Sequence, residues 1–245
     1  MRSRVMKEWL MSTQRVGGAA SRNRRAHRRS TAHRGVRTRV RLGGSVLAAG
    51  LLLALGAGGL HAQQGVDVEV RGGTAIPAGE LSDAADVGGA IGVGVSYWVT
   101  SRIGLRLDGD VDILGGADIP GGGSMPDMTL WHYTAGAEVS ALDRNSTPWT
   151  VLLNGGLGAT TLDTDRFGNA SGGTQDITQT YFALNWGVKV GYDVNRSVNV
   201  SVGTQAFVTF TDKGDLRPLA ALSPSFVETD NVWTFPITAA VRFSI

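Results

Sequence analysis

One histidine and a set of charged side chains are the residues of this chain best suited to chemistry. His132 is the only histidine after residue 61. A histidine supports acyl transfer when it activates a serine and is itself oriented by an acid. Thr134 stands two residues after His132, and the sequence contains no His-x-Ser motif. We therefore expect His132 to be a hydrogen-bonding residue, and we expect no catalytic residue and no enzymatic activity.

Aspartates alternate along one short segment, at Asp108, Asp110 and Asp112. With Asp118 and Asp127 nearby they could hold a divalent cation, because hard cations prefer carboxylate oxygens. Ion-paired or solvated acids are the simpler interpretation of the same pattern. We therefore expect no metal site, and the sequence holds no motif that calls for a cofactor.

A wider set of charged residues falls on the polar face of segments whose other face is apolar. In a narrow barrel such residues share the interior, where unpaired charges are expensive, so they must pair. The predicted luminal charge network consists of Asp67, Glu69, Arg71, Arg106, Asp108, Glu138, Lys189 and Arg242. Within it, we expect Arg242 to face Asp67 and Glu69 across the seam that closes the barrel.

The elements that position these residues are eight segments in which apolar residues recur at every second position, the period of a β-strand. Their predicted bounds are 66–75, 88–99, 103–114, 128–142, 149–161, 180–193, 198–210 and 232–245. No segment after the N-terminal leader has a convincing helical period. The sequence therefore predicts an all-β fold, an eight-stranded antiparallel up-and-down barrel.

Three features favour a transmembrane barrel over a soluble one such as a lipocalin. The strands are long enough for a tilted membrane strand of about 9–11 residues. Short and long connections alternate, and the interior face carries charges where a soluble barrel needs large apolar residues. Aromatic residues form two predicted girdles, as expected at two lipid–water interfaces. The girdles are Tyr97, Trp149, Tyr192 and Phe243 near the short turns, and Trp131, Tyr133, Phe182, Phe210, Trp233 and Phe235 near the long loops.

The N-terminal part differs in composition from the rest. Residues 1–41 contain thirteen Lys/Arg and one acid, a charge of +12, whereas residues 63–245 contain ten Lys/Arg and twenty acids, a charge of −10. A fifteen-residue apolar run, Val46 to Leu60, follows the basic part. This order is typical of a secretory signal peptide. We expect residues 1–62 to be removed and residues 63–245 to form the barrel, and we expect no nucleic-acid binding.

Several stretches resemble the OmpA/OmpX-type outer-membrane β-barrel domain. They are Arg71–Leu81, Gly92–Tyr97 (GVGVSY), Ile103–Asp108 and the C-terminal Thr238–Ile245. The ending is similar to the assembly signal of that class, with Val241, Phe243 and Ile245 as its apolar positions, although Ala240 and Ile245 replace the usual glycine and terminal aromatic residue. The resemblance covers the whole of residues 63–245.

The resemblance implies a bacterial outer-membrane protein with a periplasmic N-terminus and extracellular long loops. We expect a monomer with a structural or surface binding and adhesion role, its lumen filled by the polar network. A narrow pore or a conduit for hydrophobic compounds is the alternative, and a lipid A-modifying barrel enzyme is a remote one. The expected partners are outer-membrane lipids and, during biogenesis, the secretion translocon and the barrel-assembly machinery.

Overall fold

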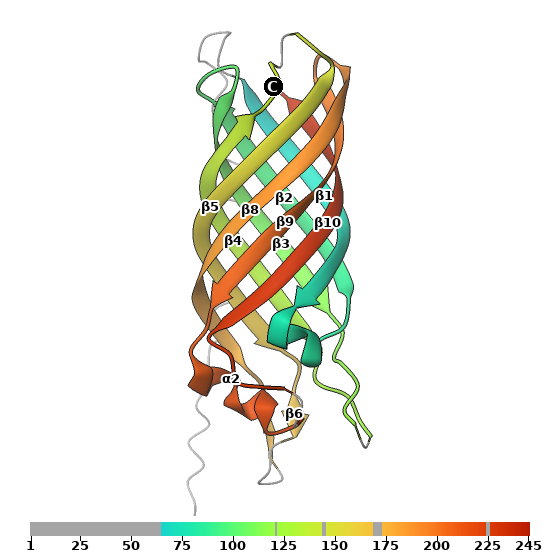
Figure 1. The fold of residues 1–245 in the computed structure, drawn as a ribbon, viewed down its shortest axis with the longest axis vertical. Helices are drawn as coiled ribbons and strands as arrows, with labels where there is room; N and C mark the ends of the chain where they lie inside the picture. The colour runs from blue at the N-terminus through green and yellow to red at the C-terminus, as the bar shows by residue number, and fades with distance from the viewer. Residues whose placement is uncertain (1–64, 121, 144–145, 169–172, 224–225) are drawn as a thin grey trace, which may run out of the picture. The chain divides into compact units, whose positions relative to one another are not determined.

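The computed structural model describes residues 65–120, 122–143, 146–168, 173–223 and 226–245. The predicted leader, residues 1–62, and its cleavage site lie outside the described residues. The described part forms a closed barrel of eight antiparallel strands with the spatial order β1-β10-β9-β8-β5-β4-β3-β2 (Figure 1). Each strand pairs with its neighbour in sequence, and β1 pairs with β10 to close the barrel.

The barrel strands agree closely with the eight predicted segments. Two of them, β3 and β9, have the predicted bounds, whereas β1 and β5 each run three residues further into a long connection. The eight strands are β1 (Val66–Ala78), β2 (Gly88–Trp98), β3 (Ile103–Leu114), β4 (Met128–Ser140), β5 (Trp149–Thr164), β8 (Thr178–Asn195), β9 (Val198–Phe210) and β10 (Asn231–Ser244).

Burial alternates along most of each barrel strand, and in the short-turn half most inward residues are polar. On β3, Leu105 and Leu107 are 58% and 59% exposed, while Arg106 between them is 3% exposed. Successive side chains of a strand point to opposite sides of the sheet. Because large apolar side chains face outward on the barrel strands, the outer surface suits an apolar surrounding.

The connections also alternate as predicted. The short ones follow β2, β4 and β8 and lie at the end of the barrel that holds the C-terminus; the long ones lie at the opposite end (Figure 1). We call residues 79–87, 115–127, 165–177 and 211–230, which make up the long connections, the loop cap.

Two short helices lie in the loop cap, and no helical period in the sequence predicts them. The loop cap contains a 3-10 helix, η1 (Gly79–Asp83), and an α-helix, α2 (Lys213–Ala220). It also contains a two-stranded sheet formed by β6 (Phe167–Gly168) and β7 (Thr174–Gln175). Both helices are too short to show a period, and α2 carries Pro218 inside it. No helix in the described ranges is long and apolar enough to cross a membrane.

A hydrophobic core fills the loop half of the lumen and continues into the cap. Inward-facing side chains such as Leu114, Leu130 and Leu162 are fully buried there. Leu216 and Leu219 of α2 belong to the same cluster. Tyr181 of β8 donates a hydrogen bond to Asp215 of α2 at 3.1 Å, which ties the helix to the barrel wall. The described residues of the loop cap therefore form a folded layer, held on the barrel by apolar burial.

Replacing Leu219 with alanine should open the loop cap. Leu219 is 1% exposed, and truncating a buried leucine costs about 2–5 kcal/mol. Limited proteolysis of residues 211–230 should therefore accelerate by about thirtyfold or more, since each 1.4 kcal/mol is a factor of ten. Arg217→Ala, at an exposed position of the same helix, should leave the cleavage rate unchanged. Equal rates for the two variants would show that α2 is not held by its apolar side.

Candidate functional site

All eight residues of the predicted luminal charge network point into the barrel. Seven of them are at most 3% exposed, and the side chain of Asp108 is 4% exposed. They come from five strands, β1, β3, β4, β8 and β10, and from the parts of these strands nearest the short connections. The structure thus brings together residues that are as far apart in sequence as positions 67 and 242.

Glu69 of β1 is the centre of this network. Its carboxylate accepts hydrogen bonds from Lys189 Nζ at 2.6 Å, from Arg106 Nη2 at 2.7 Å and from Arg242 Nη2 at 2.8 Å. Arg71 Nη1 approaches the same carboxylate at 3.0 Å. A buried carboxylate is tolerated when it is paired and its oxygens are saturated with donors. Four cations from four strands meet this requirement at one residue.

Arg242 of β10 connects the closing seam to the opposite wall. The register pairs Glu69 directly with Arg242 across the β1–β10 seam, and Asp67 Oδ2 lies 3.6 Å from Arg242 Nη1. The two terminal nitrogens of the same guanidinium donate to Oε1 and Oε2 of Glu138 on β4, both at 2.9 Å. Such a fork geometry adds directional specificity to the charge attraction. One side chain therefore bridges the barrel interior from seam to far wall.

Asp110 belongs to the same network, although it is not among the eight predicted members. Arg71 donates to it twice, from Nε at 2.7 Å and from Nη2 at 2.6 Å. Arg71 Nη2 also contacts Asp108 at 2.7 Å, and Arg106 donates to Asp108. The signal was present in the sequence, because Asp110 shares the strand face of Arg106 and Asp108. These aspartates are occupied by arginine, and the described residues contain no group of three or more His, Cys, Asp or Glu side chains suited to a metal ion.

Two glycines of β2 make room for the arginines. A Cβ at Gly94 would lie 2.7 Å from Asp108 Oδ1 and in contact with Arg106, and a Cβ at Gly92 would lie 2.9 Å from Arg71 Nε. These side chains pass directly over the bare backbone of β2. The Gly-Val-Gly-Val stretch thus has a physical explanation. Its valines face outward, and its glycines leave room inside the barrel for the charged side chains.

His132 forms a second polar layer, between the charge network and the apolar half of the lumen. Its Nδ1 lies 2.7 Å from Thr160 Oγ1, and its Nε2 lies 3.3 Å from Asp112 Oδ2. Thr234 donates to the same aspartate oxygen at 2.8 Å, and the imidazole stacks on Phe207 with ring centroids 4.0 Å apart. The hydrogen-bonding role predicted for His132 fits this geometry, whereas the aspartate partner was not foreseen.

The acid–histidine–hydroxyl order of Asp112, His132 and Thr160 is that of a catalytic triad. All three side chains, however, are fully buried, and Phe207 covers the imidazole face. A nucleophile must be reachable by a substrate carbonyl, and this hydroxyl is enclosed within the barrel. The arrangement therefore acts as a structural cross-link between β3, β4 and β5.

Amides line the wall of the lumen opposite the β1–β3 charges. Asn154, Asn185 and Gln205 are buried on β5, β8 and β9, and each has at least one amide atom without a hydrogen-bond partner among the described residues. Buried polar atoms in folded proteins are satisfied by protein groups or by ordered water. These amides are thus the part of the interior best suited to hold water.

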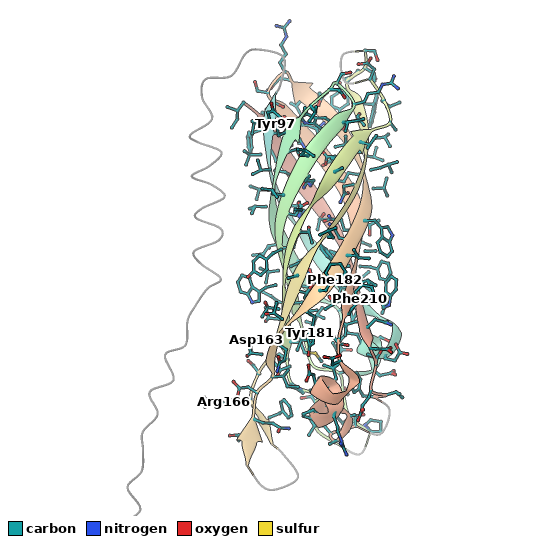
Figure 2. All side chains as sticks on the ribbon, turned by 90° about the vertical axis from the view of Figure 1, so that its left-hand side faces the viewer. Tyr97, Asp163, Arg166, Tyr181, Phe182 and Phe210 are labelled. Atoms are coloured by element: carbon teal, nitrogen blue, oxygen red, sulfur yellow. The ribbon has the colours of Figure 1, made fainter. Side chains whose placement is uncertain are left out.

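The residues of the two predicted aromatic girdles lie on the outer face. Tyr97 and the edge-to-face pair Trp149–Tyr192, with ring centroids 5.2 Å apart, lie near the short connections. Phe182 and Phe210 stack at 5.8 Å towards the loop cap, well separated from Tyr97 (Figure 2). The members Trp131, Tyr133, Trp233 and Phe235 are half-buried, and Phe243 is exposed. Of the predicted assembly signal, Val241, Phe243 and Ile245 all face outward.

Comparison with known proteins identifies the fold. Neisserial surface protein A superposes with a TM-score of 0.51 at 18% identity, over 74% of this chain and 97% of its own. A major outer membrane protein of Thermus thermophilus gives 0.46 at 14% identity, over 76% and 100%. The N-terminal β-barrel domain of Pseudomonas aeruginosa OprF gives 0.43 at 12% identity, over 76% and 100%. No protein-family model and no curated protein matches the sequence. The chain has the eight-stranded fold of small outer-membrane barrels, as the resemblance predicted.

Removing the bridging arginine should destabilise the barrel strongly. Arg242→Met leaves Glu69 and Glu138 short of a partner, and breaking a buried ion pair costs about 3–5 kcal/mol. Urea unfolding from lipid vesicles, followed by tryptophan fluorescence, measures this loss. Arg102→Met, in the exposed β2–β3 turn, should change the free energy of unfolding by less than about 0.5 kcal/mol. The double variant Arg242→Met with Glu138→Gln should recover part of the lost free energy of unfolding. If the losses of the two single variants simply add, Arg242 and Glu138 are not coupled.

Filling the space above β2 should prevent the barrel from closing around its charges. Gly94→Leu drives a side chain into Arg106 and Asp108. Migration on a gel with and without boiling reports the folded barrel, and this variant should give little or none of the heat-modifiable species. Gly155→Leu, on the outer face of β5 where the nearest atom to a new Cβ is 3.7 Å away, should fold normally. A normally folded Gly94→Leu barrel would refute the packing argument.

Proposed function

We propose that this chain is an integral bacterial outer-membrane barrel, closed along its lumen, which acts as a surface binding module through its folded loop cap. The observation that carries the proposal is the single apolar core shared by the loop half of the lumen and the cap. A conduit needs a continuous polar or open path, and this barrel has a packed core where such a path would have to emerge. The cap is the part left to make contacts.

The outer surface supports insertion in a membrane. Outward-facing residues of the barrel strands are large and apolar, and many are about half exposed; they include Ile91, Leu105, Leu107, Leu153, Leu157, Val190 and Val202. An exposed apolar belt of this extent around a whole barrel is unstable in water and stable in lipid. In the proposed orientation residues 1–62 are a removed signal peptide, the N-terminus of the barrel is periplasmic and the loop cap is extracellular.

The interior supports the closed state at two levels. In the short-turn half, Glu69, Glu138 and their arginines cross the lumen in contact with one another. In the loop half, leucine and methionine side chains such as Leu130 and Met128 fill it. An eight-stranded barrel is only wide enough for its own side chains. A pore would require both layers to rearrange at once.

The charge of the loop cap indicates the class of partner. Its four connections contain eleven acids and three bases, whereas the three short connections, 99–102, 141–148 and 196–197, contain one acid and three bases. A strongly acidic face attracts basic partners and repels acidic ones, and its field is screened by salt. We therefore propose that the cap binds a basic surface, such as a cationic protein, and that the barrel itself is a monomer in outer-membrane lipid.

Conductance and binding together test the proposed function. Wild-type barrels in planar bilayers should show no steady openings, whereas openings that disappear in Arg106→Met would favour the pore. Vesicles carrying the barrel should adhere to a polylysine-coated surface and detach as the salt concentration rises. Neutralising four exposed cap acids, with Asp86→Asn, Asp118→Asn, Asp165→Asn and Asp212→Asn, should weaken adhesion at least tenfold. Equal adhesion of the neutralised barrel would contradict the binding role of the cap.

A further inference from the structure

The outer face of the barrel has an apolar groove in its short-turn half. The groove crosses β1, β10, β9 and β8, has a volume of about 630 Å³, and is open along its length to the surroundings. This volume lies within the range of about 300–1,000 Å³ that is usual for small-molecule sites. It lies apart from the luminal network and from the loop cap.

Strand register explains why the groove is there. One row of outward side chains runs across four strands as Gly72, Ala239, Val202 and Val190. The row on the loop side of it has Ile237 beside Ala239, and the row on the turn side has Val241. Glycine and alanine stand side by side on adjacent strands, so the middle row is lower than its neighbours. The groove is therefore built into the sheet and does not depend on a mobile side chain.

The turn-side row ends in aromatic residues. It runs from Val70 through Val241 and Val200 to Tyr192, which pairs with Trp149. Both aromatic side chains are about half exposed and contact each other edge to face. Tyrosine and tryptophan with such exposure are typical of the level where acyl chains meet head groups. One end of the groove thus reaches the lipid–water interface at the short connections.

A cation stands beyond that end. Arg196 lies in the turn between β8 and β9, four residues before Val200. Its side chain is exposed. The short connections as a group carry more bases than acids, so this rim attracts anions. An apolar slot that ends under an exposed cation matches a molecule with an acyl chain and a phosphate.

We propose that this groove is a phospholipid site: one acyl chain lies along Gly72 and Ala239, and Arg196 contacts the phosphate of the head group. The proposal rests on the proposed membrane insertion, which puts the short connections in the periplasmic leaflet. The lowered floor is a single row between two rows of larger side chains, which suits one acyl chain. The occupant is therefore a single retained phospholipid, distinct from the exchanging lipids around the rest of the barrel.

Native mass spectrometry of the barrel, extracted from outer membranes in mild detergent, tests the site. Wild type should retain one phospholipid, and Ala239→Leu should reduce that retention at least tenfold because leucine fills the floor of the groove. Ala137→Leu, the same change on the exposed outer face of β4, should retain the lipid as wild type does. Equal retention in the two leucine variants would overturn the proposal.

The head-group contact is tested with offered lipids. Wild type should bind phosphatidylglycerol at least fivefold better than diacylglycerol, which has the chains without the phosphate. Arg196→Gln should abolish that preference while keeping the chain-dependent part of binding. A preference unchanged by Arg196→Gln would remove the arginine from the site, and a dimer that is lost in Ala239→Leu would show that a second copy fills the groove; each result overturns the proposal. A chain that fails to insert into vesicles refutes the proposed function as well, whereas a chain that inserts and retains no lipid refutes the site alone.

Discussion

The pairing of Glu69 with four cations is the interaction on which the rest of the barrel depends. A barrel of this width has no room for bulk water around its inward charges, so those charges must neutralise one another. Glu69 achieves this with donors from β1, β3, β8 and β10, and Glu138 adds β4. Each contact also fixes a register, because a shift of one residue would turn a charged side chain towards lipid. The polar interior therefore specifies the alignment of the same strands whose apolar sides form the outer wall.

The two halves of the lumen are filled by side chains of opposite character. In the short-turn half ion pairs fill the space, and in the loop half a small apolar core does so and extends to Leu216 and Leu219. The layer of Asp112, His132 and Thr160 lies where the two meet, since its polar atoms bond to one another and Phe207 covers it. The cap therefore packs on buried apolar side chains, and the charged residues on the surface of the cap are available to bind a partner.

The sequence was informative wherever a property depends on whether a residue of a strand faces inward or outward, because the two alternate. Strand bounds, the inward set of charges and the contact of Arg242 with Glu69 all follow from alternation together with the requirement that the barrel close. Properties that depend on several segments at once were missed. The helix α2 has only two buried leucines and an internal proline, so its sequence shows no helical period. The bidentate contact of Arg71 with Asp110 and the neighbouring positions of Gly72 and Ala239 require the register between strands, which no single segment contains.

The position of Arg242 near the end of the chain has a consequence for how the barrel forms. Strands β1 to β9 contain Glu69 and Glu138 together with Arg71, Arg106 and Lys189, but the guanidinium that joins both glutamates arrives only with β10. An open sheet of seven strands thus holds incompletely neutralised carboxylates at the level where lipid would enclose them, as well as two unpaired edges. Such an intermediate is disfavoured electrostatically until the final strand docks. Ring closure and the arrival of the fourth cation are one event, so a chain stalled before β10 lacks one of the guanidinium groups that join Glu69 to Glu138.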